Sequence, residues 1–202
     1  DRVFLLLKTH MRRLREQLSV PVQREPRQIE RVVVAPQFQA ELSRVWDQYV
    51  AVQQALAADD FEKAQEAIAG LESAVTTVDT ESLKGSAAEH LWHKEHANLT
   101  ALVNKLKQAG DIKAMREDFR PLSEEVGVLA KAFGFGEAKA IYELHCPMAF
   151  EGQGAIWYQA DEDVRNPYYG ATMLKCADRV ERVVHDEPAA GEKQSHDDHS
   201  QH

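Results

Sequence analysis

The sequence predicts an all-α fold: an up-and-down four-helix bundle with a small, irregular C-terminal appendage that holds the cysteines and has room for a short β-hairpin. Apolar residues recur at spacings of three and four from residue 37 to residue 136, the period of helices that bury one face. Short connections between these segments favour antiparallel neighbours. After Gly136 the period is lost, and Gly, Pro and aromatic residues become frequent.

Four regions follow from this pattern. Residues 1–36 are expected to be an N-terminal arm or the end of an upstream region, because a stripe typical of an amphipathic helix over residues 1–18 gives way to a proline-rich segment. Residues 37–136 form the bundle, and residues 137–184 form the Cys/Met appendage of the same domain. The tail, residues 185–202, lacks large apolar side chains and should be disordered. Because the chain begins at Asp1, we expect a mature or truncated product of a longer precursor.

Each predicted helix has a boundary signal. Asp59 or Asp60 can cap the second helix and Asp111 the fourth, while the third should end at Ala109 and Gly110. Gly134 and Gly136 close the fourth helix, and Pro121 either kinks it or lies in the first turn of a split segment. The apolar stripes that should form the core include Phe38, Leu42, Val45, Trp46, Tyr49, Val52, Leu56, Phe61, Ala64, Ile68, Leu71, Val75, Val78, Leu91, Leu99, Leu102, Leu106, Met115, Phe119, Leu122, Val126, Leu129 and Phe133.

Composition excludes several classes of function. The 202 residues carry a net charge of −9, which argues against a nucleic-acid surface. The apolar run from Val3 ends at Lys8, too short for a membrane span. The sequence has no HExxH, nucleophile elbow, phosphate-binding loop or Cys-x-x-Cys pair, and Asp161–Asp163 indicate a turn or a helix start. We therefore expect a binding module rather than an enzyme.

The sulfur-containing residues gather in HCPMAFEGQGAIWYQADEDVRNPYYGATMLKC, from His145 to Cys176. Cys146 and Met148 alternate around a proline, and Met173 and Cys176 lie one helical turn apart. Two thiolates and two thioethers make a soft ligand set that favours Cu(I), or Ag(I), over Zn(II), Mg(II) or Ca(II). His145 is either a fifth ligand or points to the opposite face of a strand.

Other interpretations of these residues remain open. Cys146 and Cys176 can form a disulfide that staples a structural, protein-interaction bundle, or they can be reduced buried thiols. Met148 and Met173 can fill the core against the neighbouring aromatic rings. In either case we expect the two cysteines to lie side by side, because the loop between them is rich in turn formers. We also expect the bundle to bury a core independent of the sulfur region and to fold without metal.

The series HCPMAFEGQGAIW, RNPYYG and MLKC resembles the signature of a bacterial domain family of formally unknown function. The pattern of that family is Cys-Pro-Met-Ala, Gly-Ala-x-Trp, Asn-Pro-Tyr-Phe-Gly and Met-x-x-Cys. Here Tyr169 stands where Phe is usual, and Ala177 where Gly often follows the second Cys. Cys-Pro-Met also resembles the heavy-metal-binding motif Tyr-x-Cys-Pro-Met-His, with Ala149 in place of its histidine.

Members of this family occur as exported stand-alone proteins and at the C-terminus of periplasmic adaptor subunits of heavy-metal efflux pumps. The resemblance runs from about Phe38 to Val184. It implies a periplasmic or otherwise extracytoplasmic setting, a part in metal transport or resistance, and an efflux adaptor, pump or periplasmic metallochaperone as partner.

The histidines offer weaker signals. His90, His93 and His96 are three apart, so only neighbouring pairs share a helix face; a solvated polar face is the favoured interpretation and a secondary divalent-metal site the alternative. His185, His196, His199 and His202 either loosely capture Cu(II), Ni(II) or Zn(II) or belong to a solubilising tail.

Overall fold

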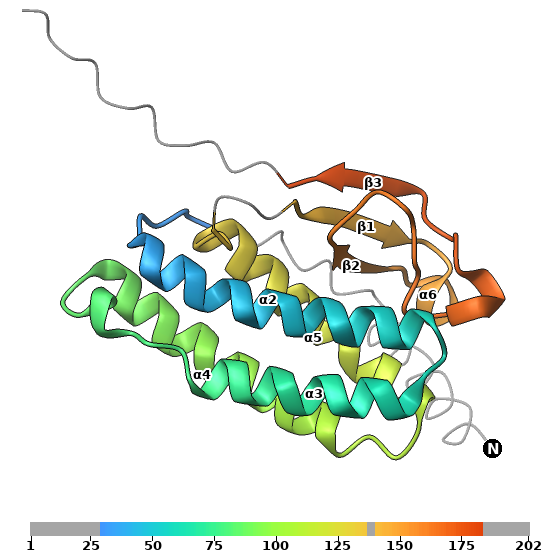
Figure 1. Cartoon of the computed structure of the whole chain (residues 1–202). Coiled ribbons are helices and arrows are strands. Elements are labelled where there is room, and N and C mark those ends of the chain that lie inside the picture. Colours follow the sequence, from blue (N-terminus) through green and yellow to red (C-terminus); the bar gives the residue numbers. More distant parts are fainter. Residues whose placement is uncertain (1–28, 137–139, 184–202) are drawn as a thin grey trace, which may run out of the picture.

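The computed structural model describes residues 29–136 and 140–183. Four long helices are followed by a small region that contains strands, as predicted (Figure 1). With the labels of Figure 1, the helices are α2 (Pro36–Ala57), α3 (Phe61–Thr76), α4 (Ala87–Lys107) and α5 (Ile112–Ala132), with a short 3-10 turn η1 (Glu81–Leu83) before α4. The predicted helix at residues 1–18 and the predicted disordered tail lie outside the described residues.

The helix boundaries follow the predicted signals. The Asp60 side chain accepts a hydrogen bond from the Lys63 amide at 3.0 Å, and Asp111 accepts one from the Ala114 amide at 2.8 Å. Gly134, at φ 74°, takes the left-handed conformation that ends α5. Pro121 lies in the interior of α5, which is one continuous helix rather than a split segment.

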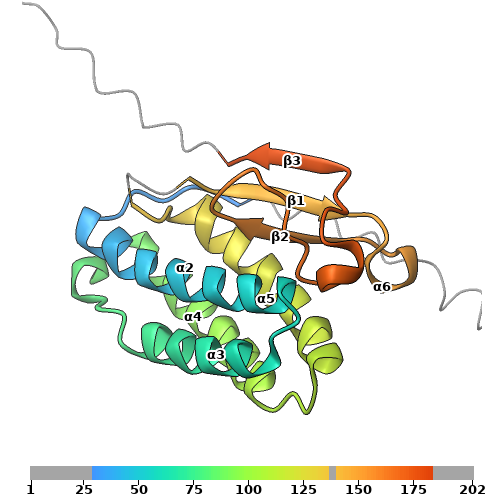
Figure 2. The same ribbon diagram turned by 45° about the vertical axis from the view of Figure 1, so that its right-hand side comes forward.

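The C-terminal region is a three-stranded antiparallel sheet rather than a hairpin alone. The sequence pattern predicts short strands at residues 140–145 and 179–184, which β1 (Tyr142–Cys146) and β3 (Arg179–Arg182) overlap, whereas β2 (Ala155–Gln159) was not predicted. The strand order is β2-β1-β3, so the cysteine-bearing strand is central. The short turns α6 (Ala149–Gly152) and η2 (Gly170–Met173) lie at the end of the sheet where β1 finishes (Figure 2).

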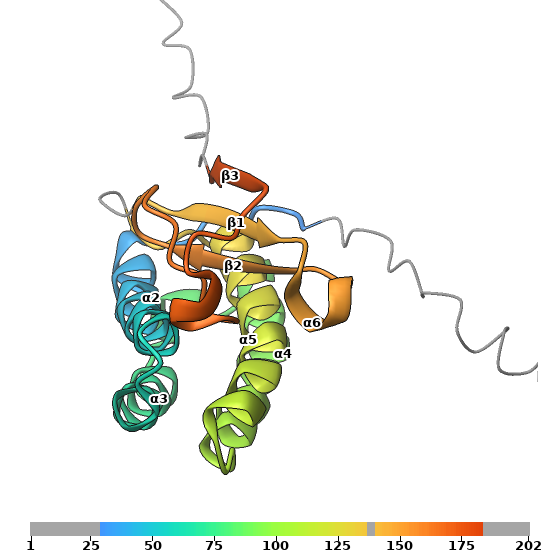
Figure 3. The same ribbon diagram turned by 90° about the vertical axis from the view of Figure 1, so that its right-hand side faces the viewer.

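The sheet covers α2 and α5, with α3 and α4 on the far side of the bundle (Figures 1 and 3). The Tyr49 hydroxyl from α2 joins these layers, since it accepts the Tyr158 amide of β2 at 3.0 Å and lies 2.9 Å from the Ser123 hydroxyl of α5. Tyr158 in turn packs directly on Gly127 of α5.

One hydrophobic core runs through both regions. Trp157 and Leu144 of the sheet are fully buried in the same cluster as Trp46 and Phe119 of the bundle, and Cys146 belongs to it as well. The expectation that the bundle core is independent of the sulfur region was therefore wrong. The reason is that the side of α2 and α5 that faces away from α3 and α4 is apolar, and the sheet supplies the residues that bury it.

Residues 29–35 form no helix or strand and lead into α2 at Pro36. The Val32 amide donates to the Ala132 carbonyl at 2.9 Å, while Ile29, Val32 and Val34 pack against the core. No helix in the described part of the chain is long and apolar enough to cross a membrane.

Candidate metal centre

The two cysteines meet at the end of the sheet. The Sγ atoms of Cys146 and Cys176 are 3.5 Å apart although 30 positions separate them in the chain. Cys146 ends β1 and is fully buried, whereas Cys176 follows η2 and is partly buried; both are free thiols. The predicted side-by-side placement is confirmed.

Both methionines are tied to Cys176 through the backbone. The Met148 amide hydrogen-bonds to the Cys176 sulfur, and the Cys176 amide donates to the Met173 carbonyl at 3.0 Å. The Met148 side chain is 53% exposed, so it does not fill the core, while Met173 is partly buried. All four residues of the predicted sulfur set therefore come together at one end of the molecule.

The environment of Cys176 favours the protonated thiol. Burial raises the pKa of Cys176 most, and the neighbouring Cys146 raises it further; the hydrogen bond from the Met148 amide partly opposes both effects. A soft cation that binds the Cys176 sulfur as a thiolate would displace its proton.

His145 is oriented by a different partner. Successive strand residues face opposite sides, so its ring lies across β1 from the Cys146 side chain. Its Nδ1 is 2.7 Å from Asp178 Oδ1, and the ring packs so closely on Gly154 that a Cβ there would lie 2.6 Å from Nε2. Asp178 comes two positions after Cys176, and its amide donates to the His145 carbonyl at 3.1 Å. His145 thus links β1 to the segment that carries the second cysteine.

A groove of about 830 Å³ lies between α4, α5 and β2, and His145 and Gly154 are among the residues that line it. None of the four sulfur residues lines it. The candidate site is therefore defined by the converging cysteines and methionines rather than by this groove.

Asn166, part of the RNPYYG motif, has a structural role that the sequence analysis did not predict. Its fully buried side chain accepts the Tyr168 amide at 2.8 Å and donates to the Cys176 carbonyl at 2.9 Å. Its own amide donates to the Leu174 carbonyl at 2.8 Å. Asn166 thereby fixes the loop that presents Cys176. The Asn-Pro dipeptide, a frequent turn initiator, was the signal for it.

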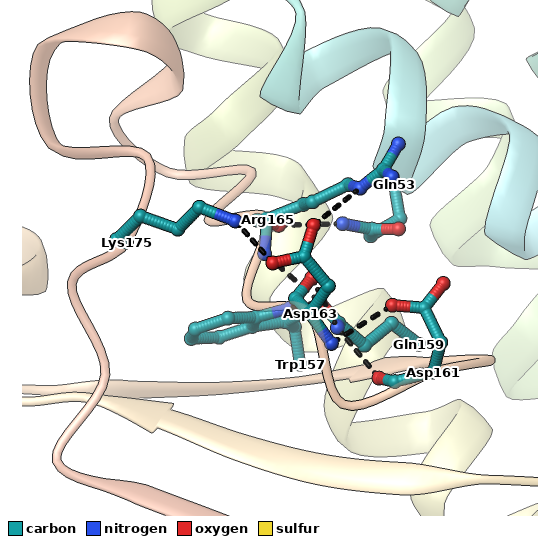
Figure 4. Close-up of polar contacts among 7 residues, drawn as sticks. All are labelled: Gln53, Trp157, Gln159, Asp161, Asp163, Arg165 and Lys175. Carbon is teal, nitrogen blue, oxygen red and sulfur yellow. Dashed lines mark hydrogen bonds and ion pairs between the residues drawn. The ribbon is translucent and has the colours of Figure 1, made fainter.

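A second polar cluster braces the same loop (Figure 4). Buried Gln159 accepts the Trp157 indole N–H at 3.0 Å and donates to the carbonyls of Asp161 and Asp163 at 2.7 and 3.0 Å. The Asp163 carboxylate pairs with Lys175, the neighbour of Cys176. Asp161 Oδ1 accepts the Asp163 amide at 3.0 Å, so these acids form the predicted turn.

The turn after Cys-Pro-Met is strained. Phe150 and Glu151 adopt left-handed backbone angles, with φ of 52° and 59°, which side chains other than glycine rarely take. The centre of the Phe150 ring lies 5.3 Å from that of the Tyr168 ring and 5.2 Å from the Arg120 guanidinium. The Tyr169 hydroxyl donates to the Met148 carbonyl at 2.6 Å. These contacts hold the Met148 backbone in place despite the strain.

The histidines of α4 do not converge. His90 and His93 are exposed, which agrees with a solvated face, whereas His96 lies 3.2 Å from the Val75 carbonyl and packs on Trp92. Within residues 29–136 and 140–183, no group of three or more His, Cys, Asp or Glu side chains is placed to hold a metal ion. The tail histidines lie outside the described residues.

The comparisons with known proteins agree with the coarse part of the resemblance. Residues 45–138 match the family model described as "Protein of unknown function (DUF3347)". This match covers most of the bundle and confirms a domain of unknown function; it ends before the sulfur residues. No curated protein and no solved structure matches the chain.

Proposed function

We propose that this protein binds Cu(I), or Ag(I), through Cys146, Cys176, Met148 and Met173. The observation that carries the proposal is the 3.5 Å separation of the two cysteine sulfurs, with both methionine backbones bonded to Cys176. Two thiolates on one tetrahedral ion with bonds of about 2.3 Å lie roughly 3.8 Å apart, so the pair needs to open by only a few tenths of an ångström.

The type of ligand favours a soft ion. The described residues offer no carboxylate or imidazole cluster to complete a site around the cysteines, and Zn(II) usually takes four Cys or His ligands. The backbones of Met148 and Met173 contact Cys176, and the thioether sulfur that these residues carry matches monovalent copper or silver. His145 is already bonded to Asp178, so its contribution is to hold the two cysteine-bearing segments together rather than to complete the set.

The setting we propose is extracytoplasmic. The resemblance of the Cys/Met motifs supports a periplasmic role in heavy-metal efflux or resistance, in which the protein passes metal to or from an efflux adaptor, pump or metallochaperone. We propose a binding module rather than an enzyme.

Copper uptake by the purified protein tests the proposal. We expect the reduced parent to bind one Cu(I) per chain, measured by metal analysis after desalting and by native mass spectrometry. Cys176→Ser should lose most of this uptake, because only one thiolate remains. His93→Ala, an exposed histidine on α4, is the matched control and should bind as the parent does. Equal uptake by the parent and Cys176→Ser would contradict the proposal.

A structural bundle stapled by a Cys146–Cys176 disulfide is the second candidate, and the same 3.5 Å separation favours it. Mass measurement of the protein purified without reductant distinguishes the two. A mass deficit of two hydrogens that persists in the presence of Cu(I) supports the staple, whereas free thiols that take up one Cu(I) support the metal site.

A further inference from the structure

The sulfur residues form a gradient of exposure. Cys146 is fully buried, Cys176 and Met173 are partly buried, and Met148 is 53% exposed. Met148 is one of three large apolar side chains exposed in the described ranges, together with Val33 and Val180. It is the only one of these three that carries a soft donor atom.

We infer that Met148 is the capture ligand of the site: its thioether makes the first contact with an incoming soft cation and hands it inward to Cys176 and then Cys146. This inference rests on the proposed function and adds the order in which the ligands act. It also defines the face of the molecule, around Met148 and Tyr169, at which a partner delivers the metal.

The backbone around Met148 suits this role. Its amide is bonded to the Cys176 sulfur and its carbonyl to the Tyr169 hydroxyl at 2.6 Å, so the residue is held beside the second cysteine. Its side chain is 53% exposed and has three rotatable bonds. Rotation of the side chain alone can therefore carry a bound ion from solvent towards Cys176.

The cysteines are poorly placed to make the first contact. Cys146 has no exposed surface, and an ion cannot reach its sulfur until it has passed the residues that cover it. Cys176 is only partly exposed, so its sulfur offers less surface to an incoming ion than the Met148 side chain does.

The transfer is an exchange of ligands without oxidation or reduction. A bond from the ion to Met148 forms as a bond to the donor's ligand breaks. Bonds to Cys176 and Cys146 form next, and each thiol releases its proton to water as it becomes a thiolate. Copper remains Cu(I) throughout.

The rate of copper loading tests the inference separately from affinity. Cu(I) bound to the chromogenic chelator bicinchoninate is mixed with protein under anaerobic, reducing conditions, and the loss of the chelate colour is followed by stopped flow. Met148→Leu removes the thioether at constant apolar volume, and Met148→Gln removes it with a polar side chain suited to an exposed position. Both should slow loading by about tenfold or more.

Met173→Leu is the matched control. It also removes one thioether, but from a partly buried position, so its loading rate should stay within about threefold of the parent while copper leaves faster. Loading of Met148→Leu at the parent's rate, or equal slowing by Met173→Leu, would overturn the inference while leaving copper binding intact. Failure of the parent itself to take Cu(I) from the chelator would overturn the proposed function, and the inference with it.

Discussion

At the scale of single residues, the position of Cys176 depends on a side chain that carries no metal chemistry. Asn166 uses one buried amide group to bond both the Tyr168 amide and the Cys176 carbonyl. Replacement by an isosteric carboxylate keeps the acceptor but removes the donor, and it sets two acceptor oxygens against each other.

We therefore expect Asn166→Asp to lower the free energy of unfolding by about 1–3 kcal/mol. The same change should release the loop, so the Cys176 thiol should react faster with Ellman's reagent under native conditions. Thermal unfolding and thiol-reaction rates measure the two effects. Asn104→Asp, at an exposed position on α4, is the control and should change neither. An unchanged reaction rate in Asn166→Asp would show that this bond does not position the cysteine.

At the scale of elements, the sheet is held on the bundle by a close approach to α5. Gly127 faces the Tyr158 ring, and a Cβ at this position would lie 2.2 Å from the tyrosine oxygen. Gly127→Ala should therefore push β2 away from α5 and cost about 1–3 kcal/mol. Gly110→Ala is the control, because a Cβ there meets nothing within 4 Å. Equal melting temperatures for the two variants would contradict this packing.

A carboxylate joins the same elements. The carboxylate of Glu143, on β1, accepts three hydrogen bonds. They come from Lys131 of α5 at 2.8 Å, the Tyr158 hydroxyl at 2.7 Å and Arg179 of β3 at 3.0 Å. Burial raises the pKa of Glu143, but the bonds from Lys131 and Tyr158 and the charge of Arg179 outweigh it, so the pKa is lowered. A lowered pKa stabilises the fold above the unfolded-state value of about 4.3, and this contribution is lost as the pH falls through the folded-state value.

Glu143→Gln should consequently be less stable than the parent by about 1–2 kcal/mol at pH 7, and the difference should shrink below pH 4. Denaturant unfolding at both pH values measures it. Glu66→Gln, at an exposed position on α3, should show no such trend. A difference between Glu143→Gln and the parent that does not change with pH would refute the role of the ionised carboxylate.

Comparison of these elements with the sequence shows which of them could be predicted. The four helices were predictable because each buries one apolar stripe, and α3 and α5 also begin at aspartate caps, Asp60 and Asp111. Strand β2 was missed because both of its faces are largely buried, so Ala155–Gln159 shows no alternation of apolar and polar residues. The convergence of the cysteines could be expected from the turn-rich loop. Asn-Pro indicated a turn at Asn166, but the particular carbonyls that Asn166 and Gln159 bond within their loop follow no periodic pattern in the sequence.

At the scale of the whole molecule, the shared core links the sulfur region to the stability of the bundle. Cys146 packs among apolar residues, so Ser at this position buries a hydroxyl in place of a thiol, at a cost of about 1–3 kcal/mol. Most of the core belongs to the four helices, however. In the absence of metal, Cys146→Ser/Cys176→Ser should therefore keep the helical circular dichroism signal of the parent. Its melting temperature should be lower. Loss of the helical signal would show that the fold depends on the sulfur site.

The central claim is that the site is selective for a soft ion, and the methionines decide it. Affinity for Cu(I) is measured by competition with a chromogenic chelator under reducing conditions, for the parent and for Met148→Leu/Met173→Leu. Leu keeps the apolar volume, so a packing role predicts a small change in stability and no change in affinity. A copper site predicts Cu(I) binding weakened by about tenfold or more, with Zn(II) binding by the two thiols little changed. Unchanged Cu(I) affinity in the double variant would contradict the account.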